Sequence, residues 1–175
     1  MIRVVIGTSS LISLELIGLI EKSLEIIEIT IPEAVKNELK ELGRYQDKEG
    51  KSAKKTLSLI NKGKIKAVKI RNQKKAKELL SKNVDYGESE CFVCCIENDI
   101  KLLIMDDIGA AYELEGLAIS KDIKMKISVA VLVELQREKI INKKQLSSYA
   151  KKLVKTREWE GGVLEILSKK YLENF

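Results

Sequence analysis

Short apolar runs alternate along the chain with longer stretches of helical periodicity. Strand-like apolar runs lie at 2–6, 26–31, 65–70 and 102–105, with a weaker one at 117–120. Alternating strands and helices predict an α/β fold, in which helices cover both faces of a mostly parallel sheet. Ligands of such sheets bind at the carboxyl ends of the strands, so candidate chemistry is sought there.

The helical stretches show where several helices begin. Ser9 or Ser10 supplies a hydroxyl that can cap the first helix. The next helix starts at Pro32, and its apolar stripe follows at Val35, Leu39 and Leu42. Later helices are predicted at 108–115, 129–139, 143–155 and 159–172, the last three within a C-terminal helical region, 129–175.

The chain has 175 residues, which fits a single domain over 1–175. No stretch reaches the roughly 18 apolar residues of a membrane span, so we expect a cytoplasmic protein without a membrane partner. Cys91, Cys94 and Cys95 lie at helical spacing and are the three cysteines of a chain that has no histidine. A zinc site needs four ligands, so these thiols are expected to pack as small hydrophobic groups.

The charge is unevenly distributed. Residues 40–82 carry 15 Lys and Arg against 4 Asp and Glu, a local balance of +11, whereas the rest of the chain has a balance of −5. A basic segment beside an acidic body suits a protein that attracts a phosphate backbone and places carboxylates elsewhere. A solvated lysine-rich hairpin with an edge strand at 64–70 has the same composition. The candidate nucleic-acid ligands are Lys51, Lys54, Lys55, Lys62, Lys64 and Lys66.

Acidic residues occur where this fold would turn them toward one point. Glu38 borders the apolar stripe of the second helix, where it faces either a cleft or solvent. Asp85 and Glu88 precede an apolar helix, and their spacing also fits a capping box. Asp106 and Asp107 directly follow the strand at 102–105, so one can cap the next helix while the other points into the crevice.

Clustered carboxylates favour a hard cation. Mg²⁺ and Mn²⁺ take oxygen ligands, and three or four carboxylates can bind one or two such ions. Two bound ions can drive displacement at phosphorus without a histidine. Dinucleotide-binding and P-loop motifs are absent from the sequence.

Four segments in order resemble the PIN-domain family, which includes VapC-type ribonuclease toxins and archaeal relatives. They are VVIGTSSLI at 4–12, IPEAVKNEL at 31–39, VDYGESE at 84–90 and LIMDDI at 103–108. The resemblance implies a three-layer α/β/α sandwich around a sheet of about five strands. It also implies an endoribonuclease that uses Mg²⁺ or Mn²⁺, with RNA as substrate and an antitoxin, another protein or a second copy as candidate partners.

By the same resemblance, Glu38, Glu88 and Asp106 fall on metal-ligand positions. Asp85 and Asp107 are adjacent candidates, and Ser9 lies near the first-strand ligand. The chain departs from the family at Gly7, where the pattern has an aspartate that ligates metal. The sequence therefore predicts either a weakened ribonuclease or a degenerate PIN domain that binds RNA or a protein partner.

Overall fold

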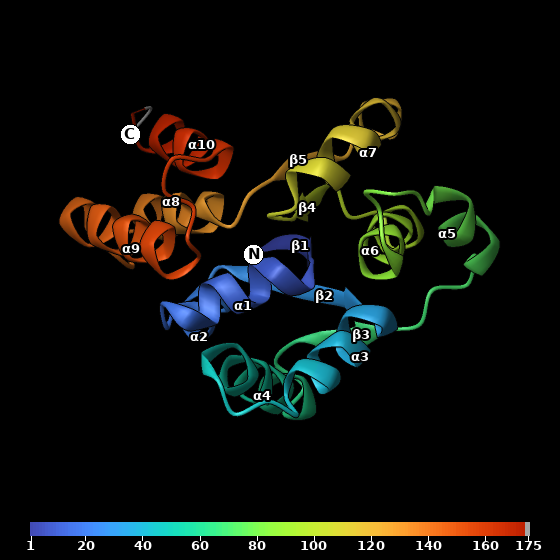
Figure 1. The fold of residues 1–175 in the computed structure, drawn as a ribbon, viewed down its shortest axis with the longest axis horizontal. Helices are drawn as coiled ribbons and strands as arrows, with labels where there is room; N and C mark the ends of the chain where they lie inside the picture. Colours follow the sequence, from blue (N-terminus) through green and yellow to red (C-terminus); the bar gives the residue numbers. More distant parts are fainter. Residues whose placement is uncertain (174–175) are drawn as a thin grey trace.

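A five-stranded parallel sheet forms the centre of the molecule in a computed structural model, which describes residues 1–173 (Figure 1). The strand order is β3-β2-β1-β4-β5. This order places β1 and β4 side by side, with Val5 paired with Leu103 and Ile6 with Ile104. The strands are β1 (Ile2–Ile6), β2 (Ile27–Pro32), β3 (Lys66–Val68), β4 (Leu102–Ile104) and β5 (Lys124–Lys126).

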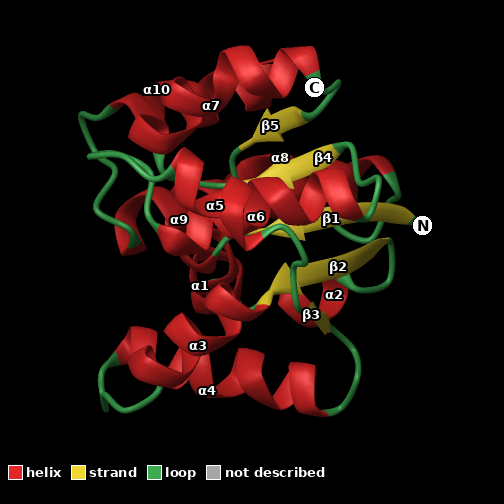
Figure 2. Cartoon of the chain, turned by 90° about the vertical axis from the view of Figure 1, so that its right-hand side faces the viewer, coloured by secondary structure: helices red, strands yellow, loops and turns green. Residues whose placement is uncertain are grey.

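Helices cover both faces of this sheet, which gives the three-layer α/β/α arrangement that the sequence predicts (Figure 1). α6 (Tyr86–Glu97) packs against β1, β2 and β4 on one face, and α8 (Val129–Arg137) lies on the other. The other helices are α1 (Thr8–Leu16), α2 (Ile20–Ser23), α3 (Glu33–Leu42), α4 (Lys48–Asn61), α5 (Gln73–Leu79), α7 (Ile108–Ser120), α9 (Lys143–Thr156) and α10 (Val163–Glu173). Figure 2 shows α3 and α4 beyond the β3 edge, and α7 and α10 near the β5 edge.

The buried residues explain why these strands and helices form. Val4, Val5 and Ile6 in β1 are at most 1% exposed, as expected for a parallel strand with helices on both faces. Phe92 of α6 is fully buried against this sheet. Cys91, Cys94 and Cys95 are buried free thiols, which confirms the expectation that they pack in the core.

The prediction of a weak fifth strand at 117–120 is wrong. Residues 117–120 lie in the last turns of α7, where Ala110, Leu114 and Ala118 form the buried stripe. The actual edge strand, Lys124–Lys126, is only three residues long and carries lysines at both ends. Its pairing with β4, rather than its own hydrophobicity, makes it a strand.

Three helix starts also differ from expectation. α1 begins at Thr8 with Gly7 as its N-cap, and neither Ser9 nor Ser10 caps it. Pro32 is the N-cap of α3 rather than its first residue. α10 begins at Val163, because Gly161 has a φ of +75° that interrupts the helix predicted from Trp159.

Candidate functional site

A cavity of about 410 Å³ opens at the carboxyl ends of β1 and β4. Gly7 N–H donates to Ile104 O at 3.0 Å, so the two strand ends lie next to each other where their chains turn into α1 and α7. We call this space the acidic cavity because six carboxylates line it. Its polar lining consists of Glu38, Glu49, Asp85, Glu88, Asp106 and Asp107, with Thr8, Ser9 and Arg157.

Glu38 reaches the acidic cavity from α3 and is oriented by two neighbouring elements. The Thr8 hydroxyl donates a hydrogen bond to Glu38 Oε2. A β-carbon built on Gly87 would lie 2.2 Å from Glu38 Oε1, so any larger residue at position 87 would displace this carboxylate. Burial raises the pKa of Glu38, and the charges of Asp85 and Glu90 raise it further. Glu38, which the resemblance assigns to a metal-ligand position, is thus a partly desolvated carboxylate.

Asp85 and Glu88 form the capping box that their spacing predicts. Glu88 N–H donates to Asp85 Oδ1 at 2.9 Å, and Asp85 N–H donates to Glu88 Oε2 at 2.8 Å. Both residues also line the acidic cavity. The pKa of Glu88 is raised to about 7, mainly by burial and in addition by the charges of Asp85, Asp107 and Glu38. Capping and a place in the cavity are therefore compatible roles for this pair.

Asp106 and Asp107 divide their roles at the end of β4. Asp107 caps α7 by accepting from Ala110 N–H at 2.8 Å. Asp106 is 5% exposed and accepts from Ser13 Oγ at 2.8 Å and from Ser128 N–H at 2.7 Å. Burial still raises the pKa of Asp106, although these hydrogen bonds favour its charged form. Asp106 is firmly anchored at the base of the acidic cavity.

Gly7 lies at the end of β1, where the family pattern has aspartate. Its φ of −76° and ψ of 165° are open to any residue, so no left-handed strain reserves this position for glycine. An added β-carbon would lie 3.8 Å from Ile104 O and 4.0 Å from Met105 Cβ, which are ordinary contacts. Ser9 is half-buried and lines the same cavity. The backbone therefore accepts a β-carbon at this position.

The lining carboxylates do not form a compact metal-binding cluster. In the part of the chain that the structure describes, no group of three or more Cys, Asp or Glu side chains is placed to bind one ion. The donors are nevertheless all oxygens, which suits Mg²⁺ or Mn²⁺. The structure brings Glu38, Glu88 and Asp106 to one cavity, while their role as metal ligands stays a prediction.

The predicted RNA-binding lysines are divided between two ends of α4. Lys51 and Lys54 are exposed in its first two turns, near Glu49, which lines the acidic cavity. Lys62 and Lys64 follow its last turn, and a 14-residue helix is about 21 Å long. Lys64 is paired with Glu21 of α2 at 3.4 Å and Lys55 with Glu15 of α1 at 3.3 Å. Lys66 is exposed at the start of the edge strand β3.

Sequence reasoning missed Arg157, which follows α9 and lines the acidic cavity. Its guanidinium is paired with the carboxylate of Glu49, and its Nε is buried without a hydrogen-bond partner among residues 1–173. Trp159 lines the cavity beside it and is 8% exposed. Arg157 and Trp159 lie outside the four family-like segments, so no sequence motif marks them.

The fold and this cavity define an α/β protein with carboxylates gathered at the carboxyl edge of a parallel sheet. A family model described as PIN domain matches residues 3–161, and the chain belongs to that family. No curated protein and no solved structure matches the chain significantly. Among residues 1–173, no helix is long and apolar enough to cross a membrane.

Proposed function

We propose that this PIN-domain protein is an endoribonuclease that uses Mg²⁺ or Mn²⁺ and is weakened by glycine at position 7. One observation carries the proposal: Glu38, Glu88 and Asp106 reach the acidic cavity from α3, α6 and the end of β4. Raised carboxyl pKa values at all three fit a site that a cation would stabilise.

Glu38, Glu88 and Asp106 would hold the cation, with Asp85 and Asp107 next to them. When bound, a divalent cation lowers the pKa of water and stabilises charge that develops at phosphorus. The chain's own contribution is orientation. Thr8 orients Glu38, and Ser13 orients Asp106, through the hydrogen bonds described above.

RNA would approach along the basic start of α4. Lys51 and Lys54 supply phosphate contacts there, and Arg157 adds a guanidinium on the cavity wall. Ser9 also lines the cavity and would contact the same RNA strand. A toxin role, an antitoxin partner and a homodimer follow only from the family resemblance and stay predictions.

The second candidate is a degenerate PIN domain that binds RNA or a protein partner without cleavage. Gly7 favours it because a ligand position carries no carboxylate. Both candidates share the fold and differ in whether RNA is cut.

A cleavage assay separates the two candidates. A mixed-sequence RNA is incubated with the protein in Mn²⁺, in Mg²⁺ or in EDTA. Metal-dependent cleavage that is lost in Glu88→Gln, but kept in the exposed α7 control Glu115→Gln, supports the nuclease. Glutamine retains the oxygen that accepts from Asp85 N–H, so the helix cap should survive. RNA binding without cleavage in any condition supports the degenerate domain.

A further inference from the structure

The outer face of α7 is apolar although it lies at the surface. The inner side of this helix packs on the molecule through Ala110, Leu114 and Ala118. The opposite side carries Tyr112 and Ile119, which are 79% and 74% exposed. Among residues 1–173, only the first residue of the chain is a more exposed large hydrophobic. A helix that is apolar on both sides normally packs on both sides.

The charges of α7 also differ from those of another surface helix. Only Glu113 and Glu115 of its 13 residues are charged, and none is basic. Glu113 accepts hydrogen bonds from Ser81 and Asn83 within the chain. α9, by contrast, exposes five lysines to solvent. A single exposed hydrophobic residue needs no explanation, but a helix face without cations is unusual in a chain with 33% charged residues.

Gly116 lies on this face between Tyr112 and Ile119, four residues after the first and three before the second. A β-carbon at position 116 would meet no atom of the described residues within 4 Å, and the φ of Gly116 is not positive. Packing within the chain therefore does not require glycine there, although glycine is a poor helix former. Glycine does allow another backbone to approach the helix closely.

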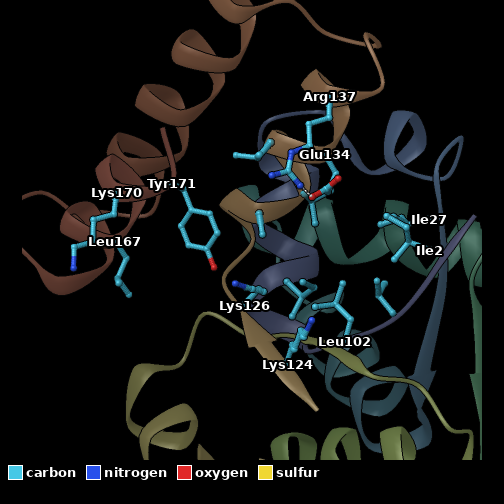
Figure 3. Close-up of a pocket in the computed structure, with 15 residues that line it drawn as sticks. Ile2, Ile27, Leu102, Lys124, Lys126, Glu134, Arg137, Leu167, Lys170 and Tyr171 are labelled. Carbon is cyan, nitrogen blue, oxygen red and sulfur yellow. Dashed lines mark hydrogen bonds and ion pairs between the residues drawn. The ribbon is translucent and has the colours of Figure 1, made fainter. Parts of the chain in front are cut away.

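A hollow of about 520 Å³ adjoins the same face, between α7, β5 and α10. Tyr112 and Ile119 line it from α7, and Leu167 and Tyr171 line it from α10. Figure 3 shows the Tyr171 side chain directed from α10 toward Lys126 of β5. The exposed face of α7 thus continues into a recess that an approaching chain would cover.

We propose that the outer face of α7 binds a second copy of this chain, with the two α7 helices antiparallel and crossing at Gly116. A two-fold axis at the crossing point places Tyr112 of each copy against the partner's Ile119. The stripe is self-complementary because its aromatic and its aliphatic side chain lie almost equally far from the glycine. The dimer would form whether or not the acidic cavity cuts RNA.

Other occupants fit this face less well. RNA needs cations, and α7 has none. A strand from another protein would have to pair with β5, where Lys124 and Lys126 protect the edge of the sheet. The hollow carries both signs of charge, Glu115 on α7 and Lys124 on β5, so a second copy meets no surface of uniformly like charge. Only a second copy requires the two halves of the stripe to complement each other.

Sedimentation equilibrium of the whole chain over a series of concentrations tests the proposal. One helix face about 20 Å long is smaller than the roughly 800 Å² per partner of a standard interface, so we expect a reversible dimer with a micromolar dissociation constant. Tyr112→Glu should raise this constant at least about tenfold, because it buries a carboxylate against an aliphatic side chain. The matched control Tyr45→Glu changes an exposed tyrosine between α3 and α4, at the opposite edge of the sheet (Figure 2), and should leave the dimer unchanged.

Two further variants test the antiparallel arrangement and the close approach. Ile119→Lys alone should weaken the dimer as Tyr112→Glu does. The double variant Tyr112→Glu/Ile119→Lys should regain at least about tenfold in affinity, because each new carboxylate faces a new ammonium group of the partner. Gly116→Ala should weaken the dimer yet raise the Tm of the dilute monomer, since alanine is the better helix former and its β-carbon meets no neighbour within the described chain.

Four results would overturn the proposal. They are a monomer at every concentration, an unchanged dissociation constant in Tyr112→Glu, an equal loss in Tyr45→Glu, and no recovery in the double variant. The Tm of each dilute variant reports whether it folds, and Gly116→Ala still decides the outcome if a charged variant does not. A wild type that stays monomeric and loses RNA binding on Tyr112→Glu would assign the face to RNA instead.

Discussion

The guanidinium of Arg157 contacts the carboxylate of Glu49 at the wall of the acidic cavity. This ion pair joins the segment after α9 to the first turn of α4, across 108 positions of sequence. It also places a cation beside five further carboxylates of the cavity lining. The guanidinium that pairs with Glu49 is also a group that suits a phosphate.

Removing this cation should weaken RNA binding. We expect Arg157→Ala to lower RNA affinity about tenfold, consistent with the loss of one charge-assisted contact. Glu49→Gln should raise affinity, because it releases the guanidinium from its carboxylate partner. Affinity is measured by fluorescence anisotropy in EDTA, with Lys155→Ala as a nearby control on exposed α9. Equal losses in Arg157→Ala and Lys155→Ala would show that only total charge matters.

Gly7→Asp should strengthen the metal site. The backbone conformation accepts a side chain, and aspartate is a good N-cap residue for α1, so the fold should stay intact. We expect Mn²⁺ affinity and ribonuclease activity to rise at least about tenfold, because losing even a residue that supports a metal ligand typically costs about 10–100-fold, and a ligand itself should matter at least as much. Gly7→Asn adds similar volume without charge and should not reproduce the gain. A wild type with metal-dependent cleavage that Gly7→Asp leaves unchanged would refute the weakening role of Gly7.

The two ends of α4 should differ in their effect on RNA. Lys51→Glu/Lys54→Glu alters the end near the acidic cavity, and Lys62→Glu/Lys64→Glu makes the same charge change at the far end. We expect the first pair to reduce affinity at least about tenfold and to flatten its salt dependence, since phosphate contacts release counterions. The second pair should have a smaller effect in the same salt titration. If both pairs act equally, RNA binds along the whole of α4.

Glu88 should make the metal-free protein less stable as pH rises. Its pKa is about 7 in the folded state against an ordinary value of 4.5. Between these values the folded protein retains a proton that the unfolded chain has released, so this stability is complete below about pH 4.5 and is lost as pH rises toward 7.

Glu88→Gln should remove that loss. After allowing for screening of this half-buried side chain, we expect the free energy of unfolding of the variant to exceed that of wild type by about 1 kcal/mol at pH 8. This corresponds to a rise in Tm of roughly 2–4 °C. Thermal melts in EDTA between pH 5 and about 8 measure it. Adding Mn²⁺ should reverse the order of the two melting temperatures, because the ion should stabilise wild type more than the variant. If the Tm values of the two proteins in EDTA change in parallel with pH, the pKa of Glu88 is not raised.

The sequence by itself determined most of the sheet and the order of the motifs. β1 and β4 are mainly apolar and β2 is rich in isoleucine, because a parallel strand is covered on both faces, so their composition reveals them. The capping box of Asp85 and Glu88 was equally readable, because capping depends on residues three apart. Local chemistry of this kind needs no knowledge of the rest of the chain.

Only the tertiary structure decided which distant groups meet. β5 is a strand because β4 offers it partners, and its own lysines give no such signal. Arg157 reaches Glu49 because α9 packs on α1, which in turn packs on α4. The anchoring of Asp106 by Ser13 and Ser128 likewise joins three separate parts of the chain. Such contacts depend on packing between elements, and neither periodicity nor spacing within one segment encodes them.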